Sequence, residues 1–221
     1  MFYWETGQPS NSNSRSCVVI QAKLHPIGGQ RPPMGPFPVV SGQPHTSSTA
    51  LALFDSLAPV TPAELLGDWR GKGLPTGHPL DGVLEAWHWH GKRFLNAEAV
   101  HPLIFTAVSG RLISVDPHWV PMALLRASWV GRLAPLGMLA PWLLPLLATD
   151  KPRARLRQLL HRDRLSGAMV YDNLPIIDVF RRLDPDSLLG LMDARGLEQP
   201  FFFTLHREVA SAGEPASALA P

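Results

Sequence analysis

The second half of the sequence places three side chains that could perform proton chemistry close together: Tyr171, Asp172 and Asp178. Two carboxylates at the rim of a pocket would permit general acid–base catalysis. Asp172-Asn173 is also typical of a tight hairpin turn, because Asp and Asn favour such positions. The pattern therefore leaves two interpretations open, an acid–base pair or a turn with buried hydrogen bonds.

Histidines supply the other candidate chemistry. The run Trp87-His88-Trp89-His90 contains a His-x-His pair, which can chelate zinc from a strand. Its apolar spacing instead predicts a helix, on which residues two apart point in different directions. We therefore expect no metal, and we expect the tryptophans to pack. His78, in the turn Thr76-Gly77-His78-Pro79, could make a polar contact at the mouth of a pocket or bond to the backbone as a turn histidine.

A run of glycines and one tryptophan, Gly67-Asp68-Trp69-Arg70-Gly71-Lys72-Gly73, points to the architecture. Glycine at every second residue leaves one strand face bare, so another chain segment can approach closely. The large indole of Trp69 then becomes a local packing plug. This pattern suits the first strand of a small closed barrel.

The remaining pattern predicts the elements that must position these residues. Helical spacing covers 50–57 and 79–90, and the proline-interrupted stretch 119–148 predicts one or two short helices. Strands are predicted at 101–108, 111–116, 153–164, 166–172, 175–182, 187–193 and 201–208. With the glycine–tryptophan strand, the count is about eight, which closes a barrel with room for one small ligand.

We therefore predict a mainly β fold, a single antiparallel calycin-like β-barrel with short helical lid segments. Residues 1–48 are predicted to form a disordered N-terminal extension and 210–221 a disordered tail. Between them, 49–118 would supply the first strands and helix, 119–150 an apolar helical insertion or lid, and 151–209 the remaining strands.

Composition narrows the functional classes. A net charge of +2 makes no case for nucleic acid, and the single Cys17 excludes an internal disulfide and a multi-cysteine metal site. The N-terminus lacks the pattern of a secretory signal, and the longest uncharged run, between Arg132 and Asp150, is short and proline-broken for a membrane span. We expect a cytoplasmic protein without a cofactor.

Six Lys or Arg residues lie between Lys151 and Arg164, and three alternate arginines, Arg153, Arg155 and Arg157, would share one strand face. This stripe could contact an anionic membrane surface, supported by the apolar run 133–148. Alternatively, the arginines are solvated or paired with acids on the next strand.

Several of these motifs resemble known families. Residues 67–71 and 73–79 look like the GXWXG domain of mostly bacterial proteins, and 151–157, 171–180 and 200–207 are similar to the domain of unknown function 4334 that follows it. The resemblance covers about residues 50–208 and implies no settled reaction. A wider resemblance is to calycins, namely lipocalins, fatty-acid-binding proteins and nitrobindins.

The calycin resemblance implies specific roles. A basic residue from the last strand, here Arg207, would stack over Trp69, either as a packing plug or as the floor of a ligand pocket. Residues 79–90, with Trp87, would form a helical lid. Nitrobindins hold haem through a late histidine, and His206 lies near that place.

The resulting functional hypothesis is a protein that binds a hydrophobic small molecule, such as a lipid or fatty acid, inside the barrel. An alternative is an enzyme that uses Asp172, Asp178 or His78, and a third possibility is haem binding through His206. No residue is assigned as catalytic. The predicted ligand-binding residues are Trp69, His78, Trp87, Tyr171, Asp172, Asp178 and Arg207.

Overall fold

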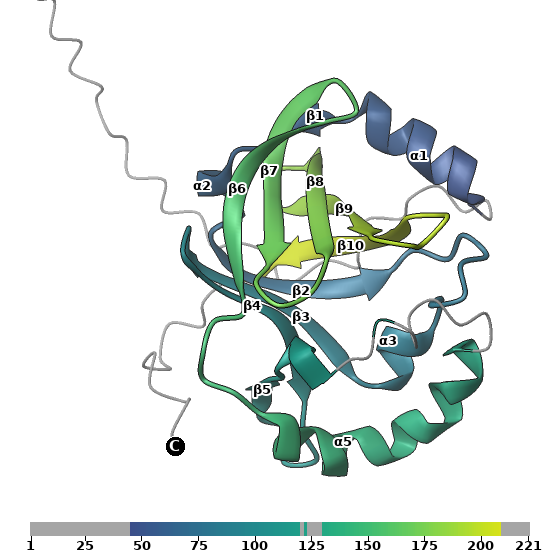
Figure 1. Cartoon of the computed structure of the whole chain (residues 1–221), viewed down its shortest axis with the longest axis vertical. Helices are drawn as coiled ribbons and strands as arrows, with labels where there is room; N and C mark the ends of the chain where they lie inside the picture. The colour runs from purple at the N-terminus through teal and green to yellow at the C-terminus, as the bar shows by residue number, and fades with distance from the viewer. Residues whose placement is uncertain (1–44, 120–121, 123–129, 209–221) are drawn as a thin grey trace, which may run out of the picture. The chain divides into compact units, whose positions relative to one another are not determined.

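A computed structural model of the chain describes residues 45–119, 122 and 130–208. Its centre is a closed antiparallel β-barrel of eight strands (Figure 1). The predicted mainly β barrel is confirmed. The N-terminal extension, up to residue 44, and the tail from 209 lie outside the described residues. The first described helix already begins at Ser47, capped by Thr46.

The strands follow one another around the barrel in the order β2, β3, β4, β6, β7, β8, β9 and β10, and β10 returns to pair with β2. Their bounds are Gly67–Gly73, Trp89–Asn96, Ala99–Thr106, Ala154–His161, Arg164–Tyr171, Ile176–Asp184, Ser187–Ala194 and Phe201–Arg207. Two short strands, β1 (Ala58–Pro59) and β5 (Leu112–Ser114), add to β8 and β4.

Helices are short and lie around the strands of the barrel (Figure 1). The first part of the chain supplies α1 (Ser47–Ser56), α2 (Pro62–Leu65) and α3 (Val83–Ala86). A turn of 3₁₀ helix, η1 (Pro117–Trp119), follows β5. Between β5 and β6, the 3₁₀ helix η2 (Val130–Leu139), α5 (Ala140–Leu143) and the 3₁₀ helix η3 (Leu144–Leu147) form one helical segment. This segment packs against α3, so it covers the same end of the barrel as α3 does.

Successive residues of each strand point alternately into the barrel and away from it, so the buried apolar side chains form two clusters, one inside the barrel and one on its outer face. On β8, Ile176 and Phe180 face the barrel interior, whereas Val179 faces outward and packs with Phe54 of α1. Since successive strand residues point to opposite faces, this pattern fixes the register of β8. Asp178, in phase with the inward residues, is thereby placed inside the barrel.

The predicted helix at 79–90 is wrong over most of its length. Only Val83–Ala86 is helical, and Trp89 already begins β3. His88, between them, has a positive φ of 61°, which ends the helical turn. Among the described residues, no helix is both long and apolar enough to cross a bilayer.

Candidate functional site

A cavity of about 320 Å³ opens inside the barrel at the end that α3 and the helical segment cover. Its wall is mostly apolar and aromatic, with rings from Trp87, Trp89, Phe105, Phe201 and Phe203. The volume falls at the lower end of the range of small-molecule sites. Four polar residues also line the cavity, namely Lys92, Asp116, Tyr171 and Asp178.

The central feature of this wall is a buried ion pair. Lys92 Nζ lies 2.8 Å from Asp178 Oδ2, and the two side chains are only 3% and 1% exposed. Lys92 Nζ also donates to the carbonyl oxygen of Pro102 at 3.2 Å. A pair this deeply buried rarely adds net stability over apolar residues of similar size, because desolvating both charges costs several kcal/mol. Its position in a cavity wall therefore points to a role in binding or chemistry.

Aromatic rings surround the ammonium group. Its nitrogen lies 5.0 Å from the ring centroid of Phe203, 5.6 Å from that of Trp89 and 5.9 Å from that of Tyr171. The faces of such rings attract a cation, most strongly where water is excluded. Trp89 and Phe203 also contact each other edge to face, with centroids 5.8 Å apart.

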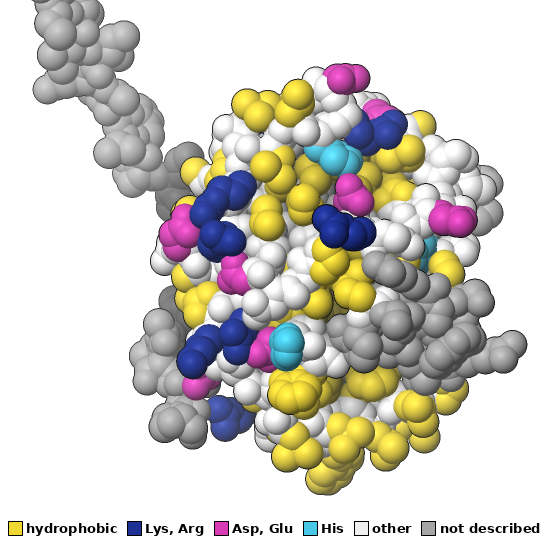
Figure 2. Space-filling view, in the orientation of Figure 1, with side chains coloured by type: hydrophobic (Ala, Val, Ile, Leu, Met, Phe, Trp, Pro, Cys, Tyr) yellow, Lys and Arg dark blue, Asp and Glu magenta, His cyan; other side chains and the backbone are white. Residues whose placement is uncertain are grey.

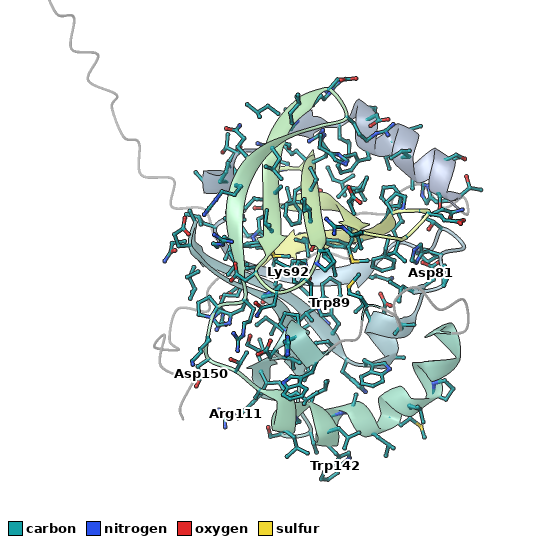
Figure 3. All side chains as sticks on the ribbon, in the orientation of Figure 1. Asp81, Trp89, Lys92, Arg111, Trp142 and Asp150 are labelled. Atoms are coloured by element: carbon teal, nitrogen blue, oxygen red, sulfur yellow. The ribbon has the colours of Figure 1, made fainter. Side chains whose placement is uncertain are left out.

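Two glycines make room for these rings. A Cβ atom on Gly71 would overlap the six-membered ring of Trp89, and one on Gly190 would overlap the ring of Phe203. The bare face of the glycine–tryptophan strand therefore serves the cavity directly, since Gly71 leaves the space that Trp89 fills. Figure 3 shows Trp89 and Lys92 in the middle of the barrel, while Trp142 lies at its outer edge.

An irregularity in β3 brings Lys92 into the cavity. Trp89 and Lys92 are three residues apart, so in a regular strand they would face opposite sides. The register of β3 against β4 shifts between Trp89 and Arg93, with Gly91 at the centre of the shift. A Cβ atom on Gly91 would overlap the backbone oxygen of Trp69. The shift therefore requires glycine there, and it places both side chains on the inner face.

Two buried polar atoms in the cavity wall lack a hydrogen-bond partner among the described residues. They are the acceptor Oδ1 of Asp178 and the donor Nε1 of Trp89. Leaving such a group unpaired costs about 1–3 kcal/mol, so unpaired groups in native structures call for an explanation. Both line the same cavity, and a ligand with a polar group would satisfy them.

Burial also changes the protonation equilibria. The pKa of the Asp178 carboxyl is raised because burial penalises its charged form, although Lys92 opposes this effect. The pKa of the Tyr171 hydroxyl is raised well above its usual value, first by burial and then by the charge of Asp178. Tyr171 therefore remains a neutral hydrogen-bond donor throughout the physiological range.

The structure brings three of the predicted ligand-binding residues together. Trp87, Tyr171 and Asp178 all line the cavity. Trp69 and Arg207 form a separate closure outside the cavity wall: the guanidinium carbon lies 4.2 Å from the centroid of the indole, which is 1% exposed. Arg207 also donates to the carbonyl oxygens of Glu64 and Leu66, which ties the end of β10 to the start of β2.

The other two predicted residues lie outside the cavity wall. His78 Nδ1 accepts from the backbone N–H of Leu80 at 3.1 Å, and its ring packs on Phe201, so it is a buried turn histidine. Asp172 Oδ1 accepts from Arg155 at 2.7 Å near the surface. Asp172 follows the inward Tyr171 at the end of β7, so the two predicted carboxylates do not meet in one site.

The remaining histidine hypotheses also fall outside the cavity. His90 lies 3.0 Å from a carboxylate oxygen of Glu208, and His206 Nδ1 lies 3.0 Å from the Ser187 hydroxyl. Within the described ranges, no group of three or more His, Cys, Asp or Glu side chains is placed to hold a metal ion.

Two residues of the site were missed in the sequence, Lys92 and Trp89. Lys92 lies just beyond the predicted helix at 79–90, and the period-2 pattern of β3 is broken by the register shift around Gly91. A lysine next to a glycine inside an aromatic stretch was the one available signal, because a lone glycine in a strand often marks a bulge.

The rim of the cavity has a charged side and an apolar side. Asp116 pairs with Arg153 at 2.5 Å on the charged side. On the apolar side, Leu144 lines the cavity from within, while large side chains of the same helical segment face outward (Figure 2). The exposed ones are Leu136, Met138, Leu139, Trp142, Leu143 and Leu146.

The fold and the cavity define a small antiparallel β-barrel protein with an internal, mostly apolar cavity. Family models place it further: that of the GXWXG protein family matches residues 52–110, and that of a domain of unknown function (DUF4334) matches residues 152–207. The chain belongs to this GXWXG family, with the second domain following the first.

A solved structure is similar to this chain. The crystal structure of a protein from Thermomonospora curvata is 33% identical to this chain, with a TM-score of 0.55. The match covers 73% of this chain and 87% of that one. No curated protein matches the sequence.

Proposed function

We propose that the protein binds a hydrophobic small molecule in the barrel cavity, with a neutral polar group of the ligand directed at Lys92 and Asp178. The observation that carries this proposal is the apolar cavity with two unpaired polar atoms in its wall. Apolar burial would supply most of the affinity, because each buried methylene contributes about 0.8 kcal/mol. The polar group would fix the orientation.

The ion pair restricts the charge of the ligand. Lys92 and Asp178 together are neutral, so an ionised fatty acid would bring an uncompensated negative charge into a dry site. A ketone, an alcohol or a protonated acid avoids this cost. We therefore expect methyl heptyl ketone and octanol to bind more tightly than octanoate at neutral pH.

Isothermal calorimetry with these three compounds tests the proposal. Leu103→Trp would fill part of the cavity and should weaken binding at least tenfold. Leu160→Trp, on an outward position that is 72% exposed, is the matched control and should bind like the native protein. Equal binding by the two variants, or none by the native protein, would exclude the cavity as the site.

We also propose that the exposed apolar side chains of the helical segment contact a membrane surface, from which an apolar ligand would enter. Met138 and Leu146 are 80% exposed and Trp142 is 69% exposed, which is unusual for side chains of this size. The segment lies beside the cavity, so the bilayer would be the nearest source of ligand. The predicted arginine stripe supports this contact less, because Arg155 and Arg157 pair with Asp172 and Glu98.

Sedimentation with phosphatidylcholine vesicles, with and without phosphatidylglycerol, tests the membrane contact. The double variant Met138→Ser/Leu146→Ser should lose vesicle binding, whereas Leu160→Ser, which removes an exposed leucine elsewhere, should keep it. Binding that depends only on the anionic lipid and survives the double variant would refute the apolar contact.

A further inference from the structure

We infer that the cavity is an active site for proton transfer at a carbon next to a carbonyl group, with Asp178 as the base and Lys92 and Tyr171 as donors to the carbonyl oxygen. This inference rests on the proposed function, since the substrate is the apolar ligand itself. Its chemical class is an apolar ketone, including ketones with a double bond one carbon further along the chain.

The chemistry open to this cavity is narrow. Among the described residues that line it, there is no Ser, Thr, Cys or His, so the usual nucleophiles and the usual histidine base are missing from its wall. The remaining reactive groups are the carboxylate, the ammonium and the phenol. Lys92 Nζ lies 2.8 Å from Asp178 Oδ2 and between 5.0 and 5.9 Å from the centroids of three aromatic rings. An ammonium group donates hydrogen bonds and has no lone pair with which to attack a carbonyl.

The ammonium and the carboxylate each retain one unused position. A lysine has three N–H donors, and those of Lys92 reach two described acceptors, Asp178 Oδ2 and the Pro102 carbonyl oxygen. The third donor is left for a ligand oxygen. Asp178 uses Oδ2 in the ion pair, and its buried Oδ1 has no described partner. One residue pair can therefore polarise a carbonyl and accept a proton beside it.

The step balances without a co-reactant. Asp178 Oδ1 takes a proton from the carbon next to the carbonyl, the C–H electron pair becomes a C=C bond, and the C=O pair moves onto oxygen. The resulting enolate oxygen accepts hydrogen bonds from Lys92 Nζ and the Tyr171 hydroxyl. The protonated Asp178 then returns the proton to the same carbon, or to the far end of a neighbouring double bond, which moves that double bond into conjugation.

The environment favours this reaction over simple binding. Donors fixed in a dry cavity stabilise a developing oxyanion more than they do in water, and they need no reorganisation during the step. Burial keeps water from competing for the enolate. It also makes the carboxylate a stronger base than an exposed aspartate, in the direction already described for its pKa.

The experiment measures deuterium exchange and binding on the same samples. Methyl heptyl ketone and cyclohexyl methyl ketone are incubated with the full-length protein in D₂O, and loss of the proton signals next to the carbonyl is followed by NMR against a buffer blank. Calorimetry gives the affinity for each ketone. A β,γ-unsaturated analogue of the first ketone reports double-bond migration through the ultraviolet absorbance of the conjugated product.

We expect Asp178→Asn to lower the exchange rate about 100-fold or more while binding persists, which is the usual contribution of a general base. Asp172→Asn removes a neighbouring carboxylate outside the cavity and should exchange at the native rate. Tyr171→Phe keeps the ion pair and should lower the exchange rate with little change in affinity. If Asp178→Asn fails to fold, Lys92→Gln/Asp178→Asn removes both charges together and carries the same expectation.

The outcomes separate the two proposals. Tight binding of the ketones with neither deuterium exchange nor double-bond migration above the blank refutes proton transfer and leaves the binding function standing. Exchange that Asp178→Asn does not reduce refutes the assignment of the base. A covalent adduct on Lys92 after borohydride reduction would replace hydrogen-bond donation by imine chemistry. No binding of either ketone refutes both the inference and the proposed function.

Discussion

Substituting either member of the buried pair of Lys92 and Asp178 should destabilise the protein, whereas substituting both together should leave its stability nearly unchanged. Lys92→Met leaves the Asp178 carboxylate 1% exposed without its partner, and Asp178→Leu leaves the ammonium in the same position. Removing one member of a buried pair costs about 3–5 kcal/mol, because the other charge stays desolvated. We expect each single variant to lose about that much free energy of unfolding.

The double variant Lys92→Met/Asp178→Leu should regain most of this loss. It removes both desolvated charges, and it also removes the unpaired Asp178 Oδ1, whose burial costs about 1–3 kcal/mol. Replacing a buried pair by apolar residues is often neutral or stabilising by about 1–4 kcal/mol. We therefore expect the double variant to unfold within about 1 kcal/mol of the native protein or above it.

Urea unfolding at neutral pH, followed by circular dichroism, gives the four free energies of this cycle. In Lys92→Met the destabilisation should shrink at lower pH. The native Asp178, whose pKa is raised, takes up a proton there that the unfolded chain does not, so acid favours the native state. Single variants within about 1 kcal/mol of the native protein, or a double variant as unstable as the sum of the singles, would refute the argument that the pair is dry and coupled.

Three further predictions follow from the packing. Gly71→Ala should displace the Trp89 ring, lower the free energy of unfolding by about 1–3 kcal/mol through overpacking, and weaken ligand binding. Urea unfolding and calorimetry measure the two effects. Lys72→Ala, at an exposed position on the same strand, is the control and should change neither stability nor binding. Arg207→Met should lower the unfolding free energy by about 1–3 kcal/mol through loss of its contact with Trp69 and its two carbonyl bonds, yet leave ligand affinity per folded molecule unchanged. Burial lowers the pKa of three histidines below 6.5, namely His78, His101 and His161. As the pH falls, the unfolded chain takes up protons on these histidines before the native protein does. The free energy of unfolding, measured with urea, should therefore fall below about pH 6.5, by at most about 1.4 kcal/mol per pH unit for each histidine. A stability that stays constant in this pH range would contradict their burial.

The second half of the barrel could be predicted because its strands alternate regularly. The predicted strands at 166–172, 175–182, 187–193 and 201–208 differ by only one or two residues from β7 to β10 at most of their ends. The same alternation explains why Tyr171 and Asp178 point inward while Asp172 does not. Asp172 and Asp178 are six residues apart, so a period of two carried through the turn would place both on one face. The two carboxylates separate only when β7 and β8 are treated as two strands with a turn between them.

The first half resisted prediction because local spacing and tertiary structure disagree there. Leu80, Val83, Leu84 and Trp87 follow helical spacing, and all of them line the cavity from a loop and one helical turn. The pattern then continues into Trp89, which is a strand residue. His88 ends the helical turn, and the strand that follows contains a register shift around Gly91, which depends on the backbone of Trp69 in another strand. Because this constraint comes from a contact between β2 and β3, it cannot be detected from the spacing of apolar residues in either strand.

The glycine–tryptophan motif connects these two results. Its tryptophan, Trp69, closes the barrel with Arg207 and does not line the cavity, so the indole itself serves the fold. Its second glycine, Gly71, is the residue that admits Trp89 to the cavity wall, and the backbone of Trp69 is what Gly91 must approach for Lys92 to turn inward. The motif therefore shapes the cavity because Gly71 has no side chain and leaves room for the Trp89 ring, and because the backbone of Trp69 contacts Gly91. A substitution at Gly71 should consequently affect ligand binding more than one at Arg207 of similar cost in stability.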